Sequence, residues 1–145
     1  MEKTLVFIKP DAMGQKVIGS VIALLEKNFR IVALKMLWMD RNQAKRFYIV
    51  HKGKSFWEPL VEFISSNPIV VMVLEGRNVI SRIRKMIGDT DPVKSRKGTV
   101  RRIYARDNRH NIIHSSDSKK SAEREIKFFF KRKEIHSWQI KDYHL

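Results

Sequence analysis

The sequence predicts a mixed α/β domain of the α+β type, built on a four-stranded antiparallel sheet. Short apolar runs of strand type alternate with stretches in which apolar residues recur every three or four positions. Hydrophobic residues make up 43% of the 145 residues, enough for a packed core although 31% are charged. No internal repeat or Pro/Gly/Ser-rich linker divides the chain. We therefore expect one domain over residues 1–145, with a core from about 3 to 130 and a polar, basic tail over 131–145.

The first elements are expected to be a strand, a helix and a second strand. Leu5–Ile8 is a short apolar run, and a turn at Lys9-Pro10-Asp11 closes it. Apolar residues then recur at helical spacing from Val17, which predicts a helix that ends near Asn28. Residues 31–39 alternate and are rich in apolar side chains, which predicts the second strand.

Two helices are expected before the third strand. Asp40, with Gln43 three residues later, resembles a capping box that opens a helix reaching about His51. Residues 57–66 again place apolar side chains at helical spacing. The continuous apolar run over 69–74 is typical of a central strand that is buried on both faces.

The last third of the chain is expected to hold a helix, a long loop, a strand and a final helix. Asn78 can cap a helix that runs through Ile87. Periodicity then disappears over 89–109, a loop long enough to be functional. A brief strand follows at 111–114 and a helix at 118–130. This order is the split βαβ, ferredoxin-like pattern, with a helical insertion after the second strand.

Charge is the unusual feature of the composition. Thirty Lys and Arg residues against 15 Asp and Glu give a net charge of +15, and residues 93–145 alone carry +9. Such a chain attracts polyanions, whether nucleotides, nucleic acid or an anionic membrane. Zero cysteines exclude disulfides and thiolate zinc sites. Because no apolar run is long enough to span a bilayer and Met1 opens no signal-peptide layout, a cytoplasmic protein without membrane contact is expected.

Three segments carry chemical information: Ile-Lys-Pro-Asp-Ala at 8–12, Gly-Thr-Val-Arg at 98–101 and Asn-Ile-Ile-His-Ser-Ser-Asp-Ser at 111–118. With the His-Lys-Gly-Lys-Ser-Phe segment at 51–56, they resemble the nucleoside diphosphate kinase family from about Lys3 to Phe130. Each piece alone is weak, but the ordered set is highly specific. The resemblance implies a ferredoxin-like domain that moves the γ-phosphate of an NTP to an NDP in a two-step, ping-pong cycle.

The resemblance assigns the nucleophile to His114. A neutral imidazole suits this role, because one ring nitrogen attacks while an acceptor holds the N–H of the other. The family pattern gives Glu125 as that acceptor, Ser116 as a hydrogen-bonding support and Tyr48 as the tyrosine that borders the histidine. A histidine on a strand, seen without its neighbours, is more often a half-buried structural residue whose ring nitrogens are hydrogen-bonded. The surrounding motif reverses that interpretation for His114.

The resemblance also implies how nucleotide is bound. Cations would neutralise the phosphates, an aromatic ring would stack on the base, and two polar side chains would donate hydrogen bonds to phosphate or sugar. The matching residues are Lys9, Arg84 and Arg101, then Phe56, then Thr90 and Asn111. Stacking implies that any common base is accepted. Mg²⁺ would arrive on the phosphates, because no carboxylate cage is visible, and a homo-oligomer (hexamer or tetramer) is implied.

Simpler interpretations of these residues remain open. Phe56 and Tyr48 could pack the helical insertion with its other aromatic residues. Arg84 could be one of several cations on a solvated helix face. A different class of protein is also open, since a ferredoxin-like sheet with this charge suits an RNA-recognition domain. The chain lacks the aromatic-rich RNP-1 segment of that class, so we expect at most non-specific nucleic-acid binding through the basic loop and tail.

Three apparent motifs carry little weight. A hydrolytic triad of His114, Ser116 and Asp117 is disfavoured, because positions so close on one segment rarely face each other in triad geometry. His110 and His114 have the spacing of a metal pair on a helix, yet the segment reads as a strand. Gly53-Lys54-Ser55 mimics the end of a P-loop but lacks its first glycine and follows a helix. His51, His136 and His144 are interpreted as surface residues.

The chain departs from the family pattern at three places. Ser115 replaces the glycine after the active histidine, and Arg102-Ile103-Tyr104 replaces Gly-Asp-Phe after the loop arginine. Lys54-Ser55 replaces the Arg-Pro before the stacking phenylalanine. None removes an essential chemical group, but all three bear on nucleotide affinity and on the packing of the loop at 98–109.

Overall fold

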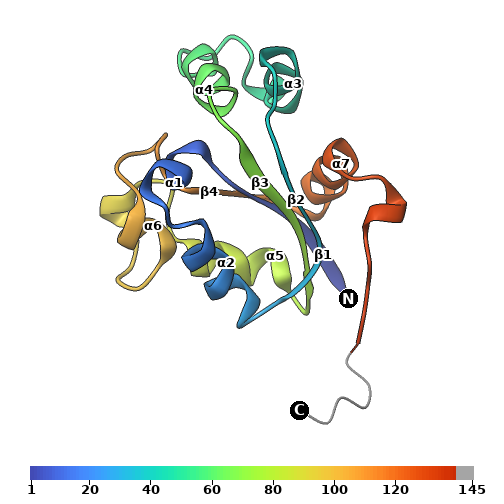
Figure 1. Ribbon diagram of the computed structural model, residues 1–145. Coiled ribbons are helices and arrows are strands. Elements are labelled where there is room, and N and C mark those ends of the chain that lie inside the picture. The colour runs from blue at the N-terminus through green and yellow to red at the C-terminus, as the bar shows by residue number, and fades with distance from the viewer. Residues whose placement is uncertain (140–145) are drawn as a thin grey trace.

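The computed structural model describes residues 1–139 and places four strands in one antiparallel sheet (Figure 1). The strands are β1 (Glu2–Ile8), β2 (Arg30–Leu37), β3 (Ile69–Gly76) and β4 (Ile113–Ser115). Their order across the sheet is β2-β3-β1-β4. The register sets Phe7 of β1 opposite His114 of β4. The predicted four-stranded, ferredoxin-like sheet is therefore confirmed.

Helices cover both faces of this sheet. In Figure 1, α2 and α5 lie together on one side, α7 lies on the other, and α3 and α4 pack beyond one end of the strands. The helices are α1 (Pro10–Gln15), α2 (Ile18–Glu26), α3 (Arg41–Phe47), α4 (Trp57–Ile64), α5 (Val79–Ile87), α6 (Val100–Tyr104) and α7 (Lys119–Phe129). Short 3₁₀ turns occur at Ile49–His51, Pro92–Lys94 and Arg132–Glu134.

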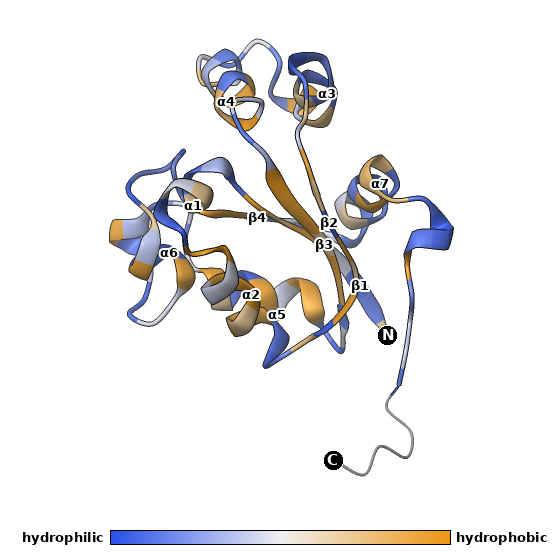
Figure 2. Cartoon of the chain, in the orientation of Figure 1, coloured by the Kyte–Doolittle hydropathy of each residue, from blue (hydrophilic) through white to orange (hydrophobic). Residues whose placement is uncertain are grey.

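The core forms two layers because successive side chains of a strand point to opposite faces. Val6 and Ile8 of β1 pack with α2 and α5, whereas Leu5 and Phe7 pack with α3, α4 and α7. Figure 2 shows hydrophobic residues along the central strands and polar ones on the loops and after α7. All eight residues of β3 are buried, as its continuous apolar sequence predicts for a central strand.

Two short helices replace segments expected to be a turn and an irregular loop. Pro10, expected in a turn, occupies the first position of α1, where its missing N–H costs nothing. Within the loop at 89–109, Thr99 caps α6 by accepting the N–H of Arg102. Helices of five or six residues are too short to show a 3.6-residue period, so the sequence pattern missed them.

One predicted helix cap is confirmed and one is wrong. Asp40 accepts the N–H of Gln43, and the Gln43 side chain accepts the N–H of Asp40, so the capping box is present. Asn78 makes no side-chain cap, because its backbone is left-handed (φ 51°) and not extended as a cap requires. Instead Glu2, at the start of β1, accepts the N–H of Ile80 at 2.9 Å.

The first nine residues of the expected basic tail lie in the described part of the chain, and some of them contact β2. The N–H of His136 donates to the carbonyl of Val32 at 2.8 Å, and Trp138 Nε1 donates to the carbonyl of Ile31 at 3.0 Å. These bonds use carbonyls that an edge strand otherwise leaves without partners, which is why the segment docks on β2. Residues 140–145 lie outside the described part. Over residues 1–139 no helix is long and apolar enough to cross a membrane.

Candidate active site

His114 and Glu125 face each other across the gap between β4 and α7. His114 Nε2 lies 2.6 Å from Glu125 Oε1, and 19% of the histidine side chain is exposed. The imidazole stacks on the Phe7 ring at 4.7 Å between centroids, with Phe47 edge-on at 5.3 Å. Because the carboxylate accepts a hydrogen bond from the Nε2–H, we infer that Nδ1 carries the ring's lone pair.

A second hydrogen bond holds the same carboxylate. Ser116 Oγ donates to Glu125 Oε1 at 3.1 Å, and the backbone N–H of Ser116 donates to the carbonyl of Leu5 at 3.0 Å. The Tyr48 ring is edge-on to His114 at 6.1 Å. Burial, with a contribution from Glu125, raises the pKa of Tyr48, so its phenol keeps the proton.

The surroundings of His114 favour the neutral form of the imidazole. Burial lowers the pKa of His114 below its ordinary value, although Glu125 opposes this through its hydrogen bond and its charge. Lys9 and Arg101 add to the lowering because they disfavour a further positive charge nearby. A neutral ring with a free Nδ1 is the nucleophilic form of histidine.

A cavity of about 560 Å³ opens beside this histidine. Nine of the ten predicted site residues line it, and Ser116, the tenth, lies beneath Glu125. The nine predicted residues that line the cavity are Lys9, Tyr48, Phe56, Arg84, Thr90, Arg101, Asn111, His114 and Glu125. The structure thus brings together residues that the sequence separates by more than a hundred positions.

The cavity is strongly cationic. Arg109 and Arg124, which the sequence analysis did not place in the site, line it together with Lys9, Arg84 and Arg101. The carboxylates in the lining are Asp117 and Glu125. Within residues 1–139 no group of three or more His, Cys, Asp or Glu side chains could hold a metal ion. The arrangement therefore suits a polyanionic ligand.

Lys9 is buried at the inner end of the cavity. Its Nζ donates to Asn111 Oδ1 at 2.7 Å. Burial, strengthened by the charge of Arg101 and opposed by Asp11, lowers the pKa of Lys9 to about 7. A negative charge placed beside Lys9 would therefore favour its protonated, cationic form.

The Arg101 guanidinium donates hydrogen bonds to three backbone carbonyls. It donates to the carbonyls of Gly88 at 3.0 Å and Ile113 at 2.8 Å, with a longer bond of 3.4 Å to that of Asn111. Burial and the charge of Arg84 lower its pKa to about 10, so it remains a cation. Three of its five N–H groups are engaged, which leaves two for a ligand in the cavity.

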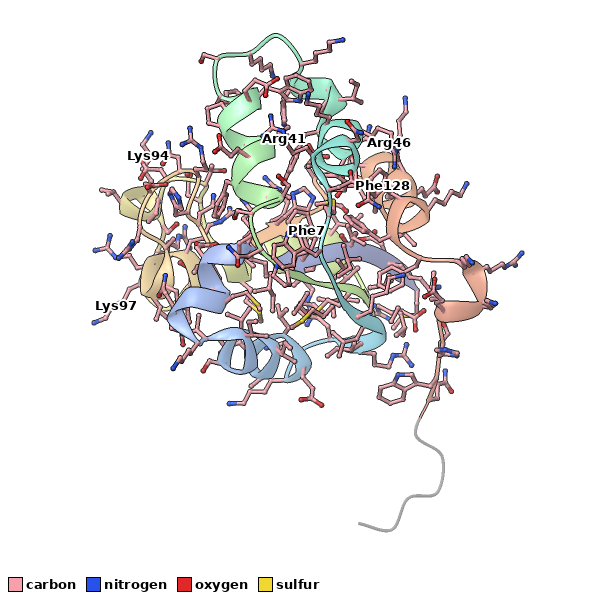
Figure 3. All side chains as sticks on the ribbon, turned by 45° about the horizontal axis from the view of Figure 1, so that its top comes forward. Phe7, Arg41, Arg46, Lys94, Lys97 and Phe128 are labelled. Carbon is pink, nitrogen blue, oxygen red and sulfur yellow. The ribbon has the colours of Figure 1, made fainter. Side chains whose placement is uncertain are left out.

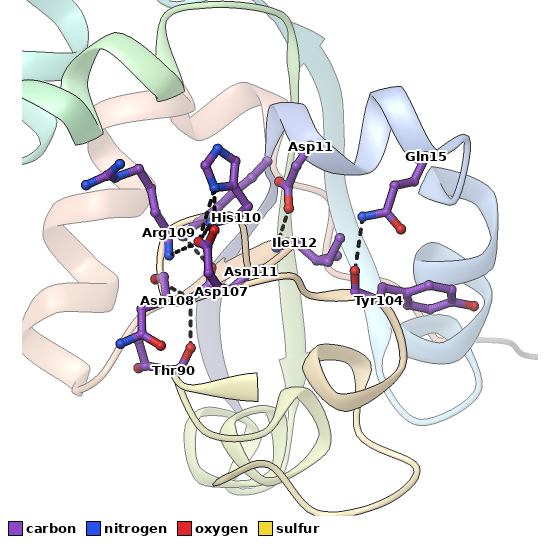
Figure 4. A network of polar contacts seen from close by, with 11 residues as sticks. Asp11, Gln15, Thr90, Tyr104, Asp107, Asn108, Arg109, His110, Asn111 and Ile112 are labelled. Atoms are coloured by element: carbon purple, nitrogen blue, oxygen red, sulfur yellow. Dashed lines mark hydrogen bonds and ion pairs between the residues drawn. The ribbon is translucent and has the colours of Figure 1, made fainter. Parts of the chain in front are cut away.

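Asn111 joins three segments, as Figure 4 shows for two of them. Its Nδ2 donates to the carbonyls of Thr90 at 3.3 Å and Asn108 at 3.1 Å, while its Oδ1 accepts from Lys9. The side chain predicted to donate to ligand thus has both donor directions occupied by the protein. The Thr90 side chain is exposed at the rim of the same cavity.

The backbone between Asn111 and His114 forms a strained γ-turn. The N–H of Ile113 donates to the carbonyl of Asn111 at 2.9 Å, and Ile112 at the centre has φ 76°. This is the rarer, strained form of the turn, and β-branched residues rarely adopt positive φ. Holding one residue in such a region costs about 1–3 kcal/mol, which the surrounding contacts must offset.

His51, interpreted from the sequence as a surface residue, lines the cavity. Its ring lies 5.1 Å from that of Phe56 and 6.0 Å from that of Tyr48, between centroids. The missed signal is spacing, because His51 follows Tyr48 by three residues in a helical pattern and so shares its face. Phe56 itself is 41% exposed at the rim, not packed in the insertion.

The structure does not form the hydrolytic triad, the histidine metal pair or the P-loop. His114 pairs with Glu125, not with Asp117, which is exposed. His110 pairs with Asp107 at 3.0 Å and does not line the cavity. Gly53-Lys54-Ser55 forms the turn between a 3₁₀ segment and α4, not the loop after a strand.

Of the three departures from the family pattern, only that at Ser115 lies in the lining of the cavity. Ser115 is buried and lines it, and its hydroxyl has no hydrogen-bond partner within residues 1–139. Arg102 is exposed on α6 and donates to the carbonyl of Val93. Lys54 Nζ lies 5.7 Å from the centre of the Phe56 ring, so it adds a cation beside the aromatic residue.

Comparison with known proteins agrees with this geometry. A family model described as nucleoside diphosphate kinase matches residues 2–135. The chain is 53% identical to the nucleoside diphosphate kinase of Methanocaldococcus jannaschii, over 92% of this chain and 96% of that protein. The corresponding protein of Persephonella marina is 49% identical, over 93% of this chain and 97% of its own length.

Solved structures give the same result. The nucleoside diphosphate kinase of Aquifex aeolicus superposes with a TM-score of 0.89 at 42% identity, covering 92% of this chain and 98% of that one. A halophilic nucleoside diphosphate kinase from Halobacterium salinarum, solved in complex with CDP, gives a TM-score of 0.92 at 37% identity, covering 96% and 93%. The chain therefore belongs to the nucleoside diphosphate kinase family and is a nucleotide-binding phosphotransferase.

Proposed function

We propose that the chain transfers the γ-phosphate of an NTP to an NDP through a phosphohistidine at position 114. The observation that carries the proposal is the bond between His114 Nε2 and Glu125 at 2.6 Å, which leaves Nδ1 available beside a cationic cavity. Burial favours the neutral ring, which can attack without first losing a proton.

In the first half-reaction, Nδ1 of His114 attacks the γ-phosphorus of the NTP. A nitrogen–phosphorus bond forms, the bond from the γ-phosphorus to the bridging oxygen breaks, and its electron pair leaves on the NDP. The ring gains positive charge, which Glu125 stabilises through Nε2 while Ser116 holds the carboxylate. A second NDP then attacks the phosphohistidine, and the same steps run in reverse.

The cations would hold the phosphates. Lys9, Arg84 and Arg101 face the cavity and can neutralise charge that spreads over the phosphoryl oxygens. Mg²⁺ would enter the site bound to the phosphates of the nucleotide. The lining offers only two carboxylates, Glu125, which is bound to His114, and the exposed Asp117, too few to hold the ion without the nucleotide. Bound in this way, Mg²⁺ would supply further charge neutralisation.

The base would stack on Phe56 at the rim. The ring is part-exposed and borders the cavity with Leu60 and His51, and stacking on an aromatic face does not depend on which base is bound. A related protein was solved with CDP. We therefore propose that NTPs and NDPs of all common bases are substrates, with Thr90 and Asn111 near the sugar and phosphates.

We also propose that the protein is a homo-oligomer, a tetramer or a hexamer. Supporting this, large apolar side chains are exposed along one edge of the sheet: Leu34 (51%) and Met36 (58%) on β2, then Trp38 (61%). Contiguous exposed apolar residues commonly mark protein interfaces. Light scattering on the purified protein measures the mass directly. A cytoplasmic location belongs to the same proposal, and cell fractionation tests it.

Non-specific nucleic-acid binding is a second proposed activity. Five exposed cations on the segment from 92 to 106, where no acidic residue occurs, support it. Charge of this density attracts a phosphate backbone without reading its sequence.

Labelling with γ-labelled ATP and Mg²⁺ tests the phosphohistidine. The wild type should retain acid-labile label on His114, and NDP should remove it. His114→Ala should retain no label and no transfer activity, because no neighbouring side chain can replace the nucleophile. His110→Ala, a histidine outside the cavity, is the matched control and should behave as wild type. Label on a serine, or activity in His114→Ala, would contradict the mechanism.

A further inference from the structure

The γ-turn at Ile112 needs restraints, because its strained backbone would otherwise relax and carry His114 with it. Ile112 is two residues before the nucleophile, and β4 pairs with β1 over only three residues, 113–115. A change of φ at Ile112 therefore re-aims the start of a very short strand. Whatever holds this turn sets the direction of the His114 ring.

Lys9, Arg101 and Asp11 hold the turn by hydrogen bonds to its backbone. The N–H of Lys9 donates to the carbonyl of Ile112 at 2.7 Å, and Arg101 donates to that of Ile113 at 2.8 Å. The N–H of Ile112 in turn donates to Asp11 Oδ2 at 3.0 Å (Figure 4). The bond from Lys9 is a backbone bond, and Arg101 also faces the cavity. Asp11 is the side chain whose contact serves the turn without bordering the nucleotide cavity.

The environment of Asp11 indicates a dedicated role. Its Oδ1 is buried and has no hydrogen-bond partner within residues 1–139. Burial raises the pKa of its carboxyl, and the Ile112 N–H and Lys9 oppose that rise. A carboxylate that is costly to bury is thus directed at one backbone N–H, that of the residue with positive φ.

We propose that Asp11 is a positioning residue for phosphoryl transfer. By accepting the Ile112 N–H it keeps the γ-turn closed, and the closed turn keeps Nδ1 of His114 aimed at the phosphorus. This inference rests on the proposed function. It predicts an effect on the rate of transfer, with little effect on nucleotide binding, because Asp11 does not line the cavity.

Three variants separate the effect of the Asp11 acceptor oxygen from that of its charge and from that of a neighbouring contact. Asp11→Ala removes the acceptor. Asp11→Asn keeps an oxygen acceptor but loses the charge, and a hydrogen bond to a neutral acceptor is weaker. Gln15→Ala is the matched control, because Gln15 Nε2 ties α1 to the carbonyl of Tyr104 at 3.0 Å, near the turn but not on it (Figure 4). Gln15→Ala should keep the wild-type rate.

The experiment is rapid-quench labelling with γ-labelled ATP and Mg²⁺, which gives both the rate constant and the label per chain. We expect Asp11→Ala to be slower by about 10- to 100-fold, as for a nucleophile displaced by up to an ångström, with Asp11→Asn intermediate. Label per chain and the KM for ATP should remain near those of the wild type. A residue that merely stabilises the fold would lower the label per chain and leave the rate of the labelled fraction unchanged.

Each outcome decides the matter. A wild-type rate in Asp11→Ala, or a loss confined to the label per chain, overturns the inference and leaves the proposed function intact. If Asp11→Ala does not fold, Asp11→Asn decides, because an unchanged rate in that variant overturns the inference too. A wild type that never takes up label overturns the proposed function, and the inference with it.

Discussion

Lys9 shows how one residue's environment sets its chemistry. An exposed lysine keeps its proton well above neutral pH, but burial and Arg101 lower the pKa of Lys9 to about 7. Between pH 7 and the ordinary lysine value of 10.5, the unfolded chain therefore binds more protons at this position than the folded one. The contribution of Lys9 to the free energy of unfolding of the free protein should therefore be lowest below pH 7. It should rise with pH over that window.

Nucleotide binding should reverse this shift. Phosphate charge beside Lys9 raises its pKa, so binding takes up a proton between about pH 7 and pH 10, and affinity falls as pH rises through that range. Calorimetry of ADP binding in two buffers of different ionisation enthalpy, at about pH 8.5, measures the proton uptake. Lys9→Met should abolish it. Equal heats in both buffers for the wild type would contradict the assignment.

At the scale of elements, the site depends on how closely α6 approaches the end of α5. Gly88 ends α5 with φ 93°, and a Cβ there would lie 2.7 Å from Thr99 Oγ1, the cap of α6. The Gly88 carbonyl also accepts a hydrogen bond from Arg101 at 3.0 Å. One glycine therefore permits both the contact between the two helices and the position of the arginine.

Gly88→Ala should lower stability and activity together. Alanine at positive φ costs more than about 1 kcal/mol, and the clash with Thr99 adds to this while moving Arg101. Gly98→Ala is the matched control, because Gly98 also has positive φ (88°) but no atom near the site of its Cβ. Urea unfolding and kcat measure both effects. Equal losses in the two variants would show that the close approach is unimportant.

At the scale of the whole molecule, cations gather away from the cavity as well as inside it. Lys94 and Lys97 project from the surface whereas Phe7 lies within (Figure 3). The exposed cations of this segment are Lys94, Arg96, Lys97, Arg102 and Arg106, and no ion pair joins them to a carboxylate within residues 1–139. They repel one another, so a phosphate backbone would relieve that repulsion.

Binding to nucleic acid, if these cations serve it, must weaken with salt. The measurement is the affinity for duplex and single-stranded DNA at two salt concentrations. Each lost phosphate contact should reduce the salt slope by about one. We would compare the wild type with Lys94, Arg96 and Lys97 changed to Gln, and with the same change at Lys131, Arg132 and Lys133. A flat salt response, or no binding at low salt, means that the charge has no such role.

Much of the fold follows from patterns that are local in the sequence. Strand alternation, helical spacing and the capping box at Asp40 involve residues at most a few positions apart, so they can be identified before folding. The two-sided burial of β3 follows equally from its apolar run. The ordered motifs around Lys9, Arg101 and His114 identified the family and the residues that meet in the cavity.

The remaining features join residues far apart, for which no local pattern exists. Glu2 caps α5 across 78 positions, and Asp11 holds Ile112 across 101. Docking of the segment after α7 depends on β2 being an edge strand, which the sheet order decides. The sequence by itself determined the strands, the longer helices and their order, and it named the residues that meet in the cavity. Only the tertiary structure decided which nitrogen of His114 is free and what holds its strand in place, because those contacts exist only once the sheet has closed.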